Sequence, residues 1–323
     1  MEEASFPPML QRLLQRVRPE SDPGLGNKVV SPRSRLIRPD GKFNTRRTGL
    51  PWWERATVYQ WLGQISWAHF TALAFGAYFV VNTLFALVYL ALGEGHLNGI
   101  RPEGLVHDFE ACWFFSAQTL TTVGYGHVNP ATGVASGVAA LEALIGLLGF
   151  GVWTGLLFNR FSRARSRILF SPVSVVTPYG DGNAWMFRIV ASHDHPLLDA
   201  RADAIFSWVP PGTQVRHYQE VVLERPSVRF FPMNWTLVHA IDEDSPLSGL
   251  ILDDLEQADV EILVLVKAHD ETYGQTVHSR FSWKAPEIRF GEKFLPMIAP
   301  GEDGAVEVDI SRLGATEAVR MPV

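Results

Sequence analysis

The sequence predicts a membrane protein with two spanning helices, a re-entrant segment between them, and an all-β domain after the second span. Three observations predict this fold class: two long apolar runs, a shorter apolar segment between them, and a series of β-type runs toward the C-terminus. We expect four parts, listed in chain order: a cytoplasmic tail at 1–50, an interfacial helix at 51–64, a transmembrane domain at 65–163 and a cytoplasmic β-sandwich domain at 164–323.

The two apolar runs cover residues 66–92 and 133–158, and each is long enough to cross a hydrocarbon core of about 30 Å. The first contains no charged side chain, and the second contains only Glu142. Residues 109–120, between them, are apolar enough to be buried but too short to span, which indicates a re-entrant half-helix.

Charge at the ends of the spans predicts their orientation. Basic residues lie before the first span and after the second, namely Arg46, Arg47, Arg55, Arg160, Arg163, Arg165 and Arg167. The charged residues between the spans are mostly acidic. Because positive residues favour the cytoplasmic side, we expect both termini in the cytoplasm and residues 94–133 outside.

The parts before and after the spans have different patterns. Residues 1–50 are rich in Pro, Gly, Ser, Arg and Asp without periodicity, which predicts a largely extended or disordered tail. Residues 52–62 mix aromatic and charged side chains, which favours an amphipathic helix at the membrane surface over an ordinary surface helix. Strands are expected at 173–179, 184–192, 204–209, 235–241, 260–268 and 287–294.

Composition and motifs exclude several classes of protein. The net charge of −6 argues against a nucleic-acid-binding protein, and Cys112 as the single cysteine rules out an intrachain disulfide. The sequence has no phosphate loop, HExxH, GxSxG or paired-cysteine metal motif, so we expect neither an enzyme nor a bound cofactor.

The re-entrant segment leads directly into a Thr-Val-Gly-Tyr-Gly motif. Its residues are Thr122, Val123, Gly124, Tyr125 and Gly126. Irregular backbone at membrane depth is tolerated only where it lines an ion- or water-filled path, and such loops supply carbonyl rings that replace the hydration shell of potassium. The motif therefore predicts a potassium-selective filter, with K⁺ bound at residues 122–125. Since one chain supplies one loop and the ring needs four, we expect a homotetramer. The rival prediction is a membrane-anchored, ligand-sensing protein without conduction.

Beyond this motif, the sequence resembles the inward-rectifier potassium channels, especially their prokaryotic branch, from about Trp52 to Phe294. The resemblance rests on the stretches FFSAQTLTTVGYG, LEALIGLLGFGVWTGLLFNRFSR, MFRI and WTLVHAIDEDSPLSG. It implies an immunoglobulin-like cytoplasmic domain, a slide helix at the membrane surface, and location in the plasma membrane, the inner membrane of a bacterium. It also implies a gate where the second helices cross.

Helical spacing and the resemblance together suggest which residues line the pore. Phe150, Thr154 and Phe158 lie on one i, i+4 stripe of the second span. The resemblance places Phe158 at the gate, although a packing or lipid-facing aromatic is the alternative. Phe150 stands where strong rectifiers carry an acidic residue, so weak block by polyamines or magnesium is expected. The resemblance implies a second constriction around Gly274, in residues 273–276.

Three further residues have competing interpretations. Gln118 occupies a filter-support position at which many family members carry Glu, so a neutral hydrogen bond replaces a charged one. Gly146 matches the family's hinge, but close helix packing explains it equally well. Glu142 is expected to bond to protein groups, the alternative being a ligand of the cavity.

Contacts with anionic lipid form the last prediction. The residues assigned to it are Trp52, Arg55, Arg160, Arg163, Arg165 and Arg167. Each basic residue near an anionic surface gains about 1 kcal/mol, so lipid control of gating is expected. The alternative is that these charges only set the topology.

Overall fold

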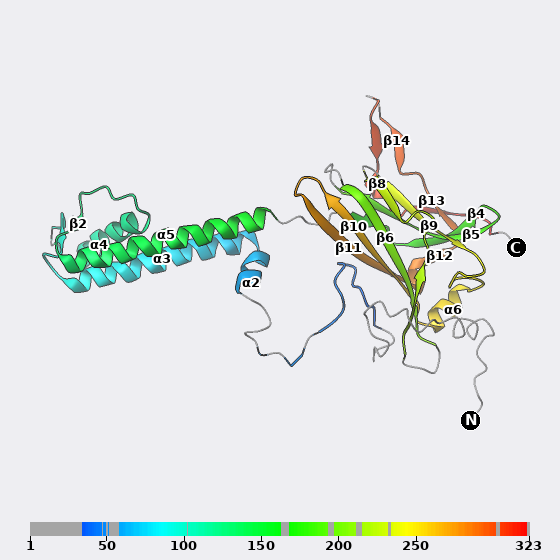
Figure 1. Cartoon of the computed structure of the whole chain (residues 1–323), viewed down its shortest axis with the longest axis horizontal. Coiled ribbons are helices and arrows are strands. Elements are labelled where there is room, and N and C mark those ends of the chain that lie inside the picture. Colours follow the sequence, from blue (N-terminus) through cyan, green and yellow to red (C-terminus); the bar gives the residue numbers. More distant parts are fainter. Residues whose placement is uncertain are drawn as a thin grey trace. The chain divides into compact units, whose positions relative to one another are not determined.

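The computed structural model describes residues 34–46, 48–49, 51, 58–101, 103–162, 168–192, 197–210, 215–231, 234–301 and 304–321. The chain forms two compact units (Figure 1). One comprises Thr48–Arg163 and is helical; the other comprises Met1–Arg47 together with Ala164–Val323 and is rich in β-structure.

The helical unit contains four described helices: α2 (Val58–Gln64), α3 (Trp67–Leu92), α4 (Leu105–Leu120) and α5 (Gly133–Phe161). The Oγ of Ser66 caps α3 by accepting a hydrogen bond from the His69 amide, at 3.3 Å. The Oγ1 of Thr132 caps α5 in the same way. Both predicted spans are confirmed, and the second continues three residues beyond the expected end. The re-entrant helix begins four residues earlier than expected.

The two long helices α3 and α5 expose most of their apolar side chains in the single chain. In the most apolar 18-residue window of each, only 17% and 11% of the residues are buried. A core helix of a soluble protein would be mostly buried, so the two helices need lipid or neighbouring subunits as their surroundings.

The β-rich unit is built around two five-stranded sheets. One sheet has the order β11–β10–β6–β7, with β8 also paired to β6; the other has the order β12–β4–β5–β3, with β9 also paired to β5. The strands of the first sheet are β6 (Leu197–Trp208), β7 (His217–Val221), β8 (Ser227–Phe231), β10 (Glu261–Asp270) and β11 (Gln275–Lys284). Those of the second are β3 (Ile168–Phe170), β4 (Ser174–Tyr179), β5 (Gly182–Ala191), β9 (Asn234–Ile241) and β12 (Ile288–Phe290).

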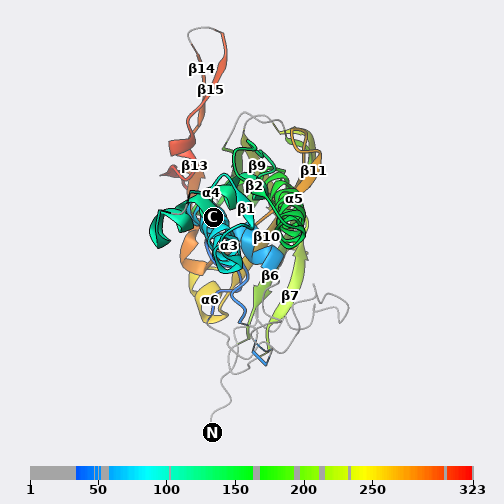
Figure 2. The ribbon, with the colours of Figure 1, turned by 90° about the vertical axis from the view of Figure 1, so that its left-hand side faces the viewer.

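Smaller elements complete the two units. They are helix α6 (Leu252–Gln257) and three two-stranded pairs: β1 (Leu97–Asn98) with β2 (Asn129–Pro130), β13 (Glu292–Phe294) with β16 (Thr316–Ala318), and β14 (Ile298–Pro300) with β15 (Val306–Val308). Figure 2 shows the β14–β15 ribbon extending away from the sandwich strands.

A continuous aromatic and aliphatic core holds the two five-stranded sheets together. Trp185, Phe187, Trp208 and Trp283 are fully buried in it. The indole nitrogen of Trp283 donates to the Ser171 carbonyl at 3.0 Å, so this buried polar atom is satisfied. The predicted β-sandwich is therefore confirmed.

The tail contains more structure than its composition predicts. The amides of Leu36 and Ile37 donate to the buried carboxylate of Glu261, and Ile37 is itself buried. Arg35 forms a salt bridge with Glu287 at 2.8 Å. Residues 34–46, expected to be largely extended or disordered, form no helix or strand, but acceptors more than 220 residues away in sequence hold this segment on the β-rich unit. Residues 1–33 lie outside the described part.

His239, in the stretch that carried the family resemblance, is held on both ring nitrogens. Its Nδ1 lies 2.6 Å from the Val222 carbonyl and its Nε2 lies 2.7 Å from Ser245 Oγ. Because a carbonyl only accepts, Nδ1 carries the proton and Nε2 accepts from the serine. Burial lowers the pKa of His239, which favours this neutral form.

Candidate functional site

The filter segment begins where α4 ends, at Leu120. Its backbone folds back on the helix, because the amides of Val123 and Gly124 donate to the Gln118 carbonyl at 2.9 and 3.3 Å. Gln118 thus contacts the predicted filter segment through its main-chain carbonyl. Within the described part of the chain, its side-chain oxygen has no hydrogen-bond partner.

Alternate residues of the filter segment have a positive φ. The angles are 59° at Thr122, 56° at Gly124 and 87° at Gly126. In an ordinary strand successive carbonyls point to opposite sides. When every second residue adopts a left-handed backbone conformation, successive carbonyls can point to the same side. A left-handed conformation is unusual for a β-branched residue such as Thr122, and such outliers cluster at functional sites.

Gly146 packs directly against the end of α4. A Cβ added there would lie 1.9 Å from the carbonyl oxygen of Leu120, far inside van der Waals contact. The absence of a side chain thus allows α5 to touch the residue that precedes the filter. By contrast, Gly149, Gly151 and Gly155 have no atom within 4 Å of an added Cβ. Of the two interpretations of Gly146, this contact supports close packing.

We therefore predict that Gly146→Ala displaces α5 from the filter. Overpacking of this kind costs about 1–3 kcal/mol, so both the thermal midpoint and potassium flux should fall. Gly137→Ala, on the same helix with open space around it, is the matched control and should lower neither, since alanine favours the helix more than glycine does. If Gly146 served only for bending, flux would fall while the thermal midpoint stayed at the control value.

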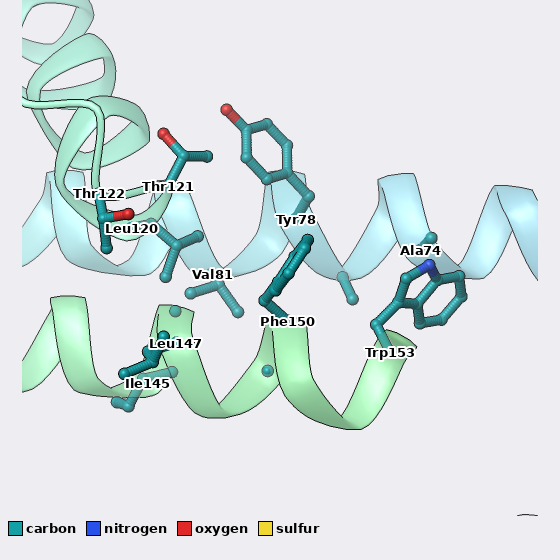
Figure 3. A pocket seen from close by; sticks show the side chains of 13 residues that line it. Ala74, Tyr78, Val81, Leu120, Thr121, Thr122, Ile145, Leu147, Phe150 and Trp153 are labelled. Carbon is teal, nitrogen blue, oxygen red and sulfur yellow. The ribbon is translucent and has the colours of Figure 1, made fainter. Parts of the chain in front are cut away.

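A cavity of about 570 Å³ lies between α3, the start of the filter and α5 (Figure 3). Thr121 and Thr122 line its filter end, while Phe150 and Trp153 line it farther along α5 (Figure 3). Phe150 is 71% exposed in the single chain, and Thr154 and Phe158 on the same stripe are also exposed. The three predicted pore residues therefore share an uncovered face of α5.

Comparison with known proteins identifies the family. A family model described as the inward rectifier potassium channel C-terminal domain matches residues 168–323, and one described as ion channel matches residues 77–163. The chain is 31% identical over 293 residues to the inward rectifier potassium channel Kirbac3.1 of Paramagnetospirillum magnetotacticum, covering 89% of this chain and 97% of that protein. This chain belongs to the inward-rectifier potassium channel family.

Mammalian members of the family are more distant. The ATP-sensitive inward rectifier potassium channel 11 of Mus musculus is 27% identical, covering 82% of this chain and 73% of that protein. The ATP-sensitive inward rectifier potassium channel 8 of the same species is 25% identical, covering 88% and 71%. The family consists of membrane ion channels, not enzymes.

Of the residues assigned to lipid in this inward-rectifier chain, only Arg160 is described. Its guanidinium donates to the carbonyls of Leu62 and Ile65 at 2.7 and 2.8 Å. It also lies 4.6 and 4.5 Å from the ring centres of Trp67 and Phe70. Arg160 therefore joins the end of α5 to the end of α2 and the start of α3. Trp52, Arg55, Arg163, Arg165 and Arg167 lie outside the described residues.

The second expected constriction is a tight turn. Gly274, with φ 60°, lies between β10 and β11, and the Tyr273 amide donates to the Asp270 carboxylate at 3.2 Å.

The structure also identifies two groups that the sequence did not reveal, the Leu120 carbonyl and the Ser116 hydroxyl. Both lie in the stretch FFSAQTLTTVGYG that carried the resemblance, but no property of that stretch assigns them a role, so only the packing of α4 against its neighbours reveals them.

Proposed function

We propose that four copies of this chain form a potassium-selective pore with one filter loop from each. The observation that carries the proposal is the filter backbone, with its alternating hand at Thr122, Gly124 and Gly126. Val123 and Tyr125 are 54% and 76% exposed in the single chain, so their apolar surfaces are left for neighbouring subunits to cover. Potassium ions are the only bound species that the function requires.

Two constrictions serve as gates in this proposal. Phe158 is 72% exposed near the cytoplasmic end of α5, where four rings around one axis would exclude water. The turn around Gly274 is the second. Both termini face the cytoplasm, in keeping with the basic residues that precede the first span and follow the second.

Anionic lipid modulates the gate in the same proposal. The basic residues that follow α5 supply the attraction, and Arg160 connects α5 to the last turn of α2 and to Ile65. A lipid that displaces α2 would thereby pull on the helix that carries Phe158.

Flux in reconstituted liposomes tests the proposal. The purified chain should conduct potassium but not sodium, its flux should change with the fraction of anionic lipid, and its mass in detergent should be that of four chains. A membrane-anchored sensor would bind a ligand through the β-rich unit and conduct no ion. Absence of potassium flux from correctly folded protein at every lipid composition would favour the sensor.

The position of Phe150 leads to a prediction about block. Phe150→Glu should create voltage-dependent block by cytoplasmic spermine, because four carboxylates around one axis concentrate the field in a poorly screened cavity. Phe150→Gln, similar to Glu in size but uncharged, is the control and should leave block weak. Current measured against voltage with and without spermine distinguishes them. Unchanged block in the Glu variant would mean that residue 150 points away from the ion path.

A further inference from the structure

Glu142 is fully buried between α3, α4 and α5 and is not among the residues that line the cavity beside Phe150. Its Oε2 accepts a hydrogen bond from the Tyr89 hydroxyl on α3 at 2.7 Å. Its Oε1 is in short hydrogen-bond contact with the Ser116 hydroxyl on α4. One carboxyl group thus joins three helices of the chain.

The hydrogen-bond donors and acceptors around Ser116 indicate whether Glu142 carries a proton. Ser116 Oγ also lies 3.0 Å from Asn82 Oδ1, while the Asn82 amide nitrogen donates to the Tyr78 carbonyl at 2.7 Å. The amide oxygen of Asn82 is therefore an acceptor, and Ser116 faces two acceptors with one hydrogen. If Glu142 were ionised, one of the two contacts to Ser116 would join two oxygens with no hydrogen between them.

A protonated Glu142 completes the chain of hydrogen bonds. Its own O–H donates to Ser116 Oγ, and Ser116 donates to Asn82 Oδ1, while Tyr89 still donates to the other carboxyl oxygen. Glu142 also forms no ion pair with any Lys, Arg or His in the described part of the chain. A buried carboxylate without a cation is costly, which favours the neutral form.

The partner on α4 connects this cluster to the filter. Ser116 lies two residues before Gln118, whose carbonyl holds the amides of Val123 and Gly124. The same stretch of α4 carries Leu120, against which Gly146 of α5 packs. A change in the hydrogen bond to Ser116 therefore shifts the end of α4, to which the filter segment is bonded.

We propose that Glu142 is a neutral, proton-bearing positioning residue that sets the position of α4, and with it the filter, through Ser116. The inference rests on the proposed function for its effect on selectivity. The protonation of the carboxyl group is independent of that function.

Four variants of the full chain test the proposal by the potassium-to-sodium permeability ratio in liposomes. Glu142→Leu and Ser116→Ala remove the link to α4 and should lower the ratio roughly two- to tenfold, the factor to which one net hydrogen bond corresponds. Glu142→Gln keeps a donor for Ser116 and an acceptor for Tyr89, so it should retain the parental ratio. Tyr89→Phe is the matched control, because it removes only the hydrogen bond between α3 and Glu142. It should lower thermal stability without lowering the ratio.

Infrared spectroscopy of the parent tests the proton directly. The carbonyl stretch of a protonated carboxyl group should be present in the parent and lose one component in Glu142→Gln. If the parent lacked this component, so that its carbonyl stretch matched that of Glu142→Gln, the neutral state would be overturned. Parental ratios in both Glu142→Leu and Ser116→Ala, or an equal loss in Glu142→Gln, would overturn the positioning role. A parent that conducts no potassium would instead refute the proposed function, with the infrared result still deciding the state of Glu142.

Discussion

Gly124→Ala is expected to abolish potassium flux while leaving the oligomer intact. Gly124 has φ +56°, a conformation that costs an L-residue about 1–2 kcal/mol because its Cβ crowds the following carbonyl. Relief of that strain would rotate the peptide and turn a carbonyl away from the ion path. In a ring of four loops the same rotation would occur four times at one ion site, so the expected loss of flux is complete.

Measurement of potassium flux in liposomes, together with the mass of the detergent-solubilised protein, checks this expectation. Gly137→Ala, a matched substitution inside α5 with no atom near an added Cβ, should conduct like the parent. Normal selective flux in Gly124→Ala would refute the assignment of the filter.

The second large effect is expected at the cytoplasmic end of α5. Phe158→Ala should raise resting potassium flux with little loss of selectivity, because four phenyl rings at one level remove water from a short stretch of the pore. An ion there must shed hydration without carbonyls to replace it, at a cost of several kcal/mol. The filter lies toward the other end of the helix, so selectivity should persist.

Resting flux in liposomes with and without anionic lipid checks the gate. Phe161→Ala is a suitable control, since the Phe161 ring packs against Trp67 of α3, with ring centres 5.0 Å apart, instead of sharing the pore stripe. If Phe158→Ala conducts like the parent under both lipid conditions, the controlling constriction lies elsewhere, and the turn at Gly274 is the next candidate.

Local properties of the sequence determined the elements that the membrane requires. The spans and the helix that precedes the predicted filter follow from hydropathy within about 30 neighbouring positions. The Thr-Val-Gly-Tyr-Gly motif was equally visible in the sequence, and its glycines at 124 and 126 accommodate the positive φ that the structure shows there. Strands with continuous apolar runs, such as β5 and β10, were also found.

Strands with mixed composition escaped prediction. β7, β8 and β11 contain charged and polar residues at most outward positions, so their pairing with β6 and β10 decides their conformation more than their own propensity does. The same holds for residues 35–37, which are ordered because Glu261 and Glu287 accept their hydrogen bonds.

Only the tertiary structure decided which groups Gly146 and Glu142 contact. As a sequence, Gly146 is compatible with bending and with packing, and Glu142 with a cavity ligand and with a buried partner. The contact of residue 146 with Leu120 joins positions 26 apart, and the bond from Tyr89 to Glu142 joins positions 53 apart. Hydropathy is a property of each segment, whereas a short contact between helices depends on how two of them pack, and that packing exists only in the folded chain.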